Sequence, residues 1–172
     1  MIVNGSTSNS KGLATEIGKK HRFDSAEQEA YLNVMRTAHL LEGVVHVFLK
    51  KHDLTESAYN VLRILRGSGP SGRRVSAIGC DMVVRVPDVT RLLDRLHAKG
   101  LVSRTREDGD RRVVIAKITP MGETLLAELD DPILEVHHRQ LGHLSPAELE
   151  ELSRLMVKAR EGLKEICDEM KD

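Results

Sequence analysis

Aromatic residues are almost absent from this sequence, which holds no tryptophan, two tyrosines and two phenylalanines among its 172 residues. Sandwiches of β-sheets are rich in aromatic and β-branched side chains, whereas a helical bundle packs well with leucine and other aliphatic side chains. The composition therefore favours a core that is aliphatic and mainly helical.

Cysteine is also scarce, with only Cys80 and Cys167 in the chain. Two cysteines are too few for the disulfide framework of a small secreted domain. No apolar run approaches the length of a membrane-spanning helix, and the N-terminus lacks the apolar region of a secretory signal. We therefore expect a cytoplasmic protein with no membrane partner.

The formal net charge is zero, which by itself argues against a nucleic-acid partner, but the charges are unevenly distributed. Residues 63–112 contain twelve Lys and Arg against six Asp and Glu, which leaves a net charge of +6. Residues 119–172 contain six against thirteen, which leaves −7. The chain is thus polarised, and its basic middle is a candidate binding surface for a polyanion.

Residues 87–100 predict a helix with one packing face and one charged face. At about 100° per residue, one stripe contains Val89, Leu92, Leu93 and Leu96, and the opposite side contains Pro87, Arg91, Asp94, Arg95 and Ala98. Residues 75–82 carry apolar side chains at i, i+3 and i+7, which predict a second, shorter helix upstream. Two short helices joined by a few residues are typical of a helix-turn-helix.

A hairpin is predicted directly after these helices. Gly100 can end the longer helix in a left-handed cap, and residues 101–106 and 112–118 predict two short strands. The turn between them, residues 107–112, has a basic end. A hairpin in this position is a wing, so the sequence predicts a winged helix-turn-helix.

These motifs resemble those of the multiple antibiotic resistance regulator (MarR) family. The similarity rests on D-V-T-R-L-L-D-R-L-H-A-K-G-L-V-S-R followed by D-G-D-R-R-V-V-I-A-K-I-T-P-M-G, and the motif order and spacing match from Leu54 to Leu129. The resemblance implies a mainly α-helical fold with a small β wing, in a triangular homodimer whose first and last helices intertwine. It also implies a transcriptional regulator, most often a repressor, that binds a pseudo-palindromic operator in double-stranded DNA. A small-molecule effector would bind where the dimer helices meet the winged domains.

Around the predicted recognition helix, the candidate DNA contacts are Arg85, Pro87, Asp88, Thr90, Arg91 and Arg95. Arg91 and Arg95 lie four residues apart on the outward face and could reach base edges or phosphates in a major groove. Alternatively, Asp94 or Asp88 pairs with them on a solvated surface. The family often has a small capping residue at position 85, so we expect this helix to begin at residues 85–87, with proline's fixed φ in place of a side-chain cap. Asp88 would then read a base or face the helix dipole.

In the wing, the candidate DNA contacts are Arg104, Arg106, Asp110, Arg111 and Arg112. Arg104 and Arg106 alternate with one intervening residue on a strand, so both lie on one face and could follow phosphates. By resemblance, Asp110 braces an arginine while another arginine enters the minor groove. We expect Arg111 at the DNA and Arg112 braced, and the sequence leaves the reverse assignment open.

The chain is predicted to have four regions: a flexible arm at 1–24, a dimerisation helix at 25–53, the winged helix-turn-helix at 54–118 and C-terminal dimerisation helices at 119–172. The arm lacks an apolar period. The terminal helices carry long apolar stripes that so small a core cannot cover. A homodimer is the natural way to bury them.

Helix starts are predicted by capping boxes at residues 25–28 and 145–148, and by a capping residue before a first-turn proline at residues 119–120. Pro132 should kink or break the helix in which it lies.

No catalytic, cofactor or metal site is predicted. The sequence has no nucleophile–base pair, phosphate loop or metal cluster, which argues against an enzyme. Its eight histidines include no i, i+4 pair with an acidic ligand, so surface or packing roles are favoured over a metal site. A redox switch at Cys80 is disfavoured because no neighbour in the sequence would activate its thiol. The alternative function is a winged-helix protein-interaction module whose basic wing meets an acidic partner.

Overall fold

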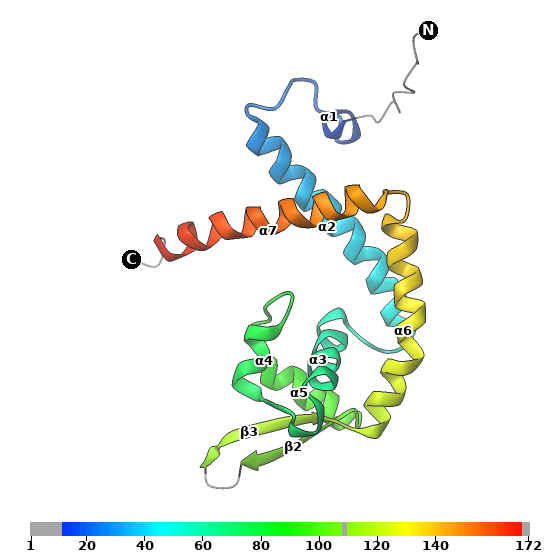
Figure 1. Cartoon of the computed structure of the whole chain (residues 1–172), viewed down its shortest axis with the longest axis vertical. Helices are drawn as coiled ribbons and strands as arrows, with labels where there is room; N and C mark the ends of the chain where they lie inside the picture. The colour runs from blue at the N-terminus through cyan, green and yellow to red at the C-terminus, as the bar shows by residue number, and fades with distance from the viewer. Residues whose placement is uncertain (1–11, 108–109, 170–172) are drawn as a thin grey trace. The chain divides into compact units, whose positions relative to one another are not determined.

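A computed structural model describes residues 12–107 and 110–169, with side chains described for 12–106 and 113–163 (Figure 1). The chain forms two compact units, Met1–Val44 and Val45–Asp172. In chain order the elements are α1 (Leu13–Glu16), α2 (Ala26–Lys50), α3 (Glu56–Gly67), the 3-10 helix η1 (Gly69–Ser71), β1 (Arg73–Arg74), α4 (Val75–Asp81), α5 (Val89–Ala98), β2 (Val102–Glu107), β3 (Asp110–Ile118), α6 (Pro120–Leu141) and α7 (Pro146–Glu169). The mainly helical fold with a small sheet is as predicted.

The first unit holds α1 and most of α2. The hydroxyl of Ser25 accepts the N–H of Gln28 at 3.2 Å, and the Gln28 side chain accepts the N–H of Asp24 at 3.0 Å. The predicted capping box therefore starts α2, with the glutamine reaching one residue further back than expected. The short helix α1 was not predicted; its Glu16 accepts a hydrogen bond from Arg36 of α2 at 2.9 Å.

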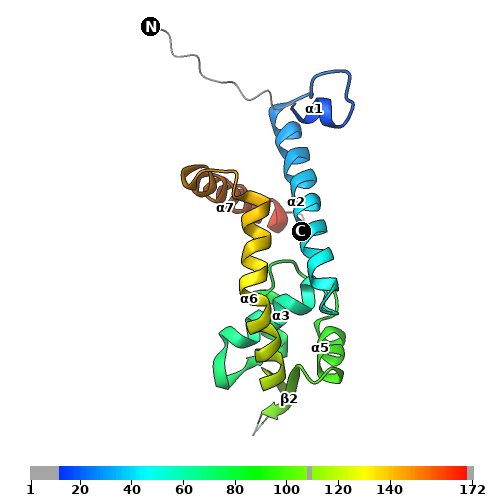
Figure 2. The same cartoon turned by 90° about the vertical axis from the view of Figure 1, so that its right-hand side faces the viewer.

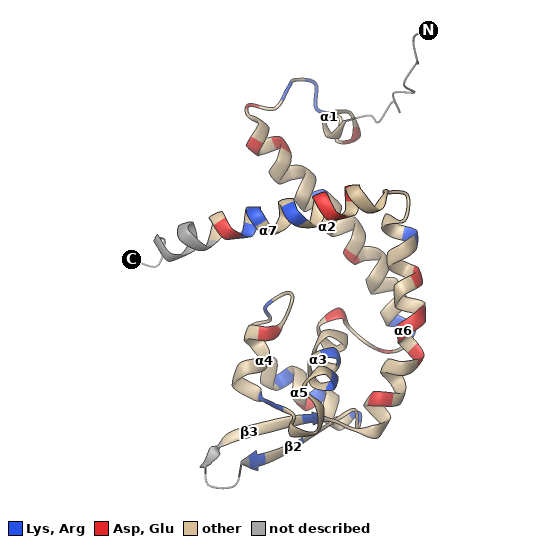
Figure 3. Ribbon diagram, in the orientation of Figure 1, with Lys and Arg blue, Asp and Glu red and all other residues tan. Residues whose placement is uncertain are grey.

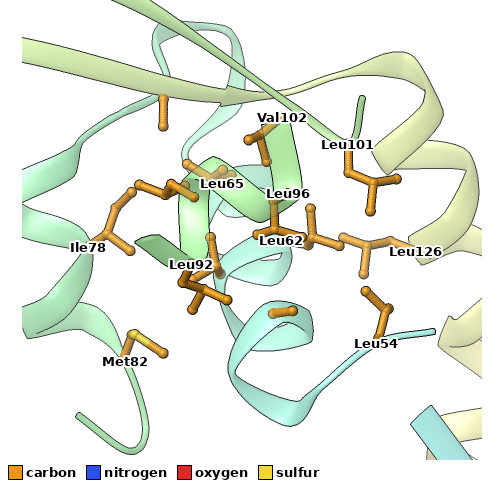
Figure 4. Close-up of a cluster of buried hydrophobic side chains, with 14 of the residues drawn as sticks. Leu54, Leu62, Leu65, Ile78, Met82, Leu92, Leu96, Leu101, Val102 and Leu126 are labelled. Carbon is orange, nitrogen blue, oxygen red and sulfur yellow. The ribbon is translucent and has the colours of Figure 1, made fainter. Parts of the chain in front are cut away.

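The second unit is built around an aliphatic core. Figure 4 shows leucines from α3, α5 and α6 directed toward one another, with Ile78 and Met82 at one side. Leu62, Leu65 and Leu126 are each fully buried. Burial of one such side chain is worth about 1.5–3 kcal/mol relative to exposure. No aromatic residue is among the buried core residues of the described chain, as the composition predicted.

The sheet is antiparallel with the strand order β1-β3-β2. Strands β2 and β3 form the predicted wing, and β1 adds a strand that was not predicted, with Arg73 opposite Ala116. Gly72 precedes it at φ 70°, and a Cβ there would lie 2.4 Å from the Ala116 carbonyl oxygen. Only glycine allows β1 to approach β3 so closely.

Helix α6 begins at the predicted cap and is not broken by its internal proline. The Thr119 hydroxyl accepts the N–H of Gly122 at 3.1 Å. The helix then continues through Pro132 to Leu141 (Figure 2), so of the predicted kink or break, the break does not occur. Leu129 and Ile133 are buried on either side of the proline, and their packing offsets the backbone hydrogen bond that proline removes.

Helix α7 begins at the second predicted capping box. The hydroxyl of Ser145 accepts the N–H of Glu148 at 3.4 Å, and the Glu148 carboxylate accepts the N–H of Ser145 at 2.8 Å. Within its described side chains, α7 buries none. In the described part of the chain, no helix combines the length and apolar character needed to cross a membrane.

Candidate nucleic-acid interface

Three leucines fix the orientation of α5. Leu92, Leu93 and Leu96 are at most 5% exposed and belong to the core of the second unit. Because they hold one face of the helix inward, Thr90, Arg91, Asp94 and Arg95 are exposed on the rest of its surface. The predicted division into a packing face and a charged face is confirmed.

The start of α5 differs from the prediction. The helix begins at Val89, and Asp88 caps it by accepting the N–H of Arg91 at 2.8 Å. The Asp88 carboxylate accepts a backbone N–H at the start of the helix, which the fixed φ of a proline cannot do. The cap therefore lies after Pro87 and not before it. Arg85 and Pro87 are exposed in the segment before the helix. Asp88 thus serves the helix N-terminus, and its contact with a base stays a prediction.

The turn between α4 and α5 is attached to α3 by a contact that the sequence did not reveal. The side-chain oxygen of Asn60 accepts the N–H of Val83 at 2.9 Å. Within the described residues, Asp53 is the only residue other than glycine with a positive φ, so the turn needs no left-handed residue at Val83. Valine at position 83 therefore adopts the turn without backbone strain.

Ion pairs divide the basic side chains of this unit into two groups. Arg66 pairs with Asp130, Arg73 with Asp81 and Lys99 with Asp53, each at 2.7 Å, and Arg104 pairs with Asp94. Among the described residues, no ion pair involves the exposed residues Arg85, Arg91, Arg95 and Arg106. Neither acid proposed as a partner of the helix arginines pairs with them, because Asp88 caps the helix and Asp94 binds Arg104. The arginines on the exposed side of α5 are therefore available to a ligand.

Arg104 and Arg106 differ in their surroundings, and a phosphate contact by Arg104 stays a prediction. Its side chain is 26% exposed and pairs with the recognition helix, whereas Arg106 is exposed. Asp110, Arg111 and Arg112 belong to β3 by their backbone, but their side chains lie outside the described residues. Their roles in the wing therefore stay predictions. In Figure 3 blue Lys and Arg segments lie on α3, α5 and β2 and also along α7, while α6 carries mainly red Asp and Glu.

A bidentate ion pair connects α3 to α6. The two terminal nitrogens of Arg66 donate to the two carboxylate oxygens of Asp130, both at 2.7 Å. Hydrogen bonding from Arg66 holds the pKa of Asp130 below its ordinary value. This contact joins residues 64 apart in the chain, and no local pattern predicts it.

A cavity of about 450 Å³ lies between the end of α2, the start of α3 and α5. It is lined by His46, Lys50, Asp53, Leu54, Thr55, Ala58, Leu92, Arg95, Leu96 and Lys99. The lining combines three basic side chains, Lys50, Arg95 and Lys99, with one acidic side chain, Asp53, and three leucines. Lys99 donates to both the carbonyl oxygen and the carboxylate of Asp53, at 2.6 and 2.7 Å, at one side of this cavity.

Other sites considered from the sequence are not assembled in the described residues. No group of three or more His, Cys, Asp or Glu side chains there could hold a metal ion. Cys80 is an exposed free thiol, and the side chain of Cys167 lies outside the described residues.

Comparison with known proteins finds one family along the winged region. The statistical model of the MarR family matches residues 54–114. A MarR transcription factor from Planctomyces limnophilus is 44% identical, with 78% of this chain and 98% of that chain covered and a TM-score of 0.63. A MarR family regulator from Streptomyces coelicolor, solved in complex with DNA, is 22% identical over 84% of this chain and 92% of its own, with a TM-score of 0.75. BpsR from Bordetella bronchiseptica, whose DNA binding is regulated by 6-hydroxynicotinic acid, is 23% identical over 77% and 98%, with a TM-score of 0.68.

Proposed function

Because the chain belongs to the MarR family of transcriptional regulators, we propose that it binds a pseudo-palindromic operator as a homodimer and represses transcription. The observation that carries this proposal is a set of exposed arginines around the recognition helix and wing that form no ion pair with any described side chain: Arg85, Arg91, Arg95 and Arg106. A helix with one face fixed in the core and arginines on its exposed side suits a major groove. The S. coelicolor relative, solved with DNA, supports the same partner.

Electrostatics give this proposal a measurable consequence. Two chains with four such arginines each could neutralise up to about eight phosphates, so affinity should fall roughly a thousandfold or more between about 50 and 200 mM salt. Sequence preference should persist as affinity falls, since base contacts and not phosphate contacts carry it.

Selection of bound sequences from random duplexes, followed by titration over this salt range, tests the proposal. Recovery of a two-fold symmetric sequence with steep salt dependence is the expected result. A protein-interaction module with a basic wing would recover no preferred sequence, and that result would contradict DNA-binding regulation.

Unpartnered apolar side chains support the homodimer. On α2 they include Tyr31 at 62% exposure and Leu40 at 58%, and on α7 they include Leu155 at 44% and Leu163 at 54%. Helices that are this exposed and apolar are normally covered by another chain. A second copy, bound through α2 and α7 with the winged domains left free, would cover both helices and place two recognition helices on one duplex.

The cavity beside α5 supports regulation by a small ligand. Its volume lies within the range of small-molecule sites. An anionic ligand with an apolar body would lie on Leu54 and Leu96 and attract Lys50 and Arg95. Because Arg95 is also a candidate DNA contact, such a ligand would remove one contact and bias the position of α5. We propose that a ligand of this class releases the operator.

A further inference from the structure

Arg104 lies between β2 and the body of the winged domain. Its partner across the sheet is Ala116, which is fully buried, and Val102 two residues earlier is 1% exposed. Side chains alternate between the two faces of a strand, so Arg104 shares the face that packs inward. This placement explains why only 26% of its side chain is exposed.

The partner of Arg104 is Asp94 on the recognition helix. Asp94 follows Arg91 by about one turn and precedes Arg95, on the exposed side of α5. An unpaired carboxylate at this position would repel nearby phosphates. The ion pair therefore neutralises Asp94 and also ties the recognition helix to the wing.

The ion pair lies near an irregularity in the hairpin. The register of the hairpin shifts between Arg106 and Glu107, two residues beyond Arg104. Within the described residues, no other ion pair joins the wing strands to α5. Among the described side chains, the Asp94–Arg104 pair is therefore the ion pair between α5 and the wing that lies nearest to this shift in register.

We propose that Asp94 and Arg104 are positioning residues that hold the wing at a fixed placement relative to the recognition helix. With this placement, α5 and the wing contact one duplex together. The inference rests on the proposed function, and in it neither side chain touches DNA. In the competing interpretation, Arg104 leaves Asp94 and contacts a phosphate when DNA binds.

Arg106 provides a matched control. It lies two residues from Arg104 on the same strand, is exposed, and forms no ion pair among the described residues. A phosphate contact at Arg106 contributes to the salt dependence of binding, whereas a positioning residue does not. The salt dependence of binding therefore distinguishes the two arginines, and a loss of fold stability alone would not change it.

The test measures binding of the full-length chain to its selected operator at several salt concentrations. The variants are Asp94→Asn, Arg104→Gln, the two combined, and Arg106→Gln; each replaces a charged side chain by an uncharged polar one. We expect each of the first two to weaken binding roughly tenfold, and the double variant to weaken it no further. The salt slope should stay unchanged for Arg104→Gln and fall by about one for Arg106→Gln. The charge swap Asp94→Arg with Arg104→Asp should restore part of the lost affinity.

Three results would overturn the inference. Tighter binding by Asp94→Asn, together with a smaller salt slope for Arg104→Gln, would make Arg104 a phosphate contact. Independent, additive effects of the two substitutions would show that the pair does not act as a unit. If the wild-type chain binds no duplex at all, the proposed function fails and the inference fails with it, whereas the first two results leave the proposed function standing.

Discussion

Replacing Asp88 by alanine should destabilise the protein through the recognition helix. The carboxylate accepts one backbone N–H at 2.8 Å at the start of α5. Loss of such a cap typically costs about 1 kcal/mol, and loss of a negative charge at the helix N-terminus adds about 0.3–1 kcal/mol. Together they predict about 1–2 kcal/mol for each chain. For a chain of this length, that lowers the midpoint of thermal unfolding by about 2–8 °C.

The assay compares Asp88→Ala with Asp88→Asn in thermal and urea unfolding, at one protein concentration because a dimer's stability depends on it. Asparagine keeps an oxygen acceptor and loses only the charge, so it should recover most of the stability. The operator preference of the asparagine variant should match that of the wild type if Asp88 acts only as a cap. If Asp88→Ala unfolds like the wild type but prefers a different base, the capping argument is refuted and Asp88 reads DNA.

Three further outcomes are expected. Asp130→Asn should cost stability at neutral pH, and this cost should shrink as the pH falls below about 3.8. Arg66 lowers the pKa of Asp130 in the folded chain, so the stabilisation is lost as the pH falls through that lowered value; urea unfolding at several pH values measures the difference. Removal of residues 145–172 should yield monomers or insoluble protein by light scattering, since it uncovers the apolar faces that α7 would cover in a dimer. In operator selection, Arg111→Ala should flatten the preference for A·T flanks and leave the central half-site preference intact, and an unchanged flank preference would exclude Arg111 from the minor groove.

The fold was predictable where local chemistry decides it. Capping boxes, a cap followed by proline, and the leucine stripe of α5 each involve residues within one or two turns of one another, so the sequence shows them directly. The wing was predictable for the same reason. The two-residue strand β1 was not, because its hydrogen bonds depend on a partner strand about 40 residues away.

The candidate site was less predictable than the fold. The sequence places Asp94, Arg95 and Arg104 in one basic region, but only packing of the sheet against α5 determines that Asp94 pairs with Arg104. Likewise, the sequence alone allows Asp88 to be a helix cap or a base contact. The position of the first turn of α5 shows that Asp88 caps the helix. Which charged groups are already paired is a property of tertiary contacts, and it separates arginines that are free to bind a ligand from those that brace the fold.

Base preference at Arg91 tests DNA recognition by α5 most directly. Arg91 is exposed on α5, and Arg139 is an exposed control on α6 that pairs with Glu135 at 3.0 Å. Affinities of the wild type, Arg91→Ala and Arg139→Ala should be measured for the selected operator and for every single-base change in one half-site. Arg91→Ala should weaken the best sequence by about 1–3 kcal/mol and remove discrimination at one base pair, while Arg139→Ala leaves the profile unchanged. Equal weakening of all sequences by Arg91→Ala would contradict base recognition by this face of α5.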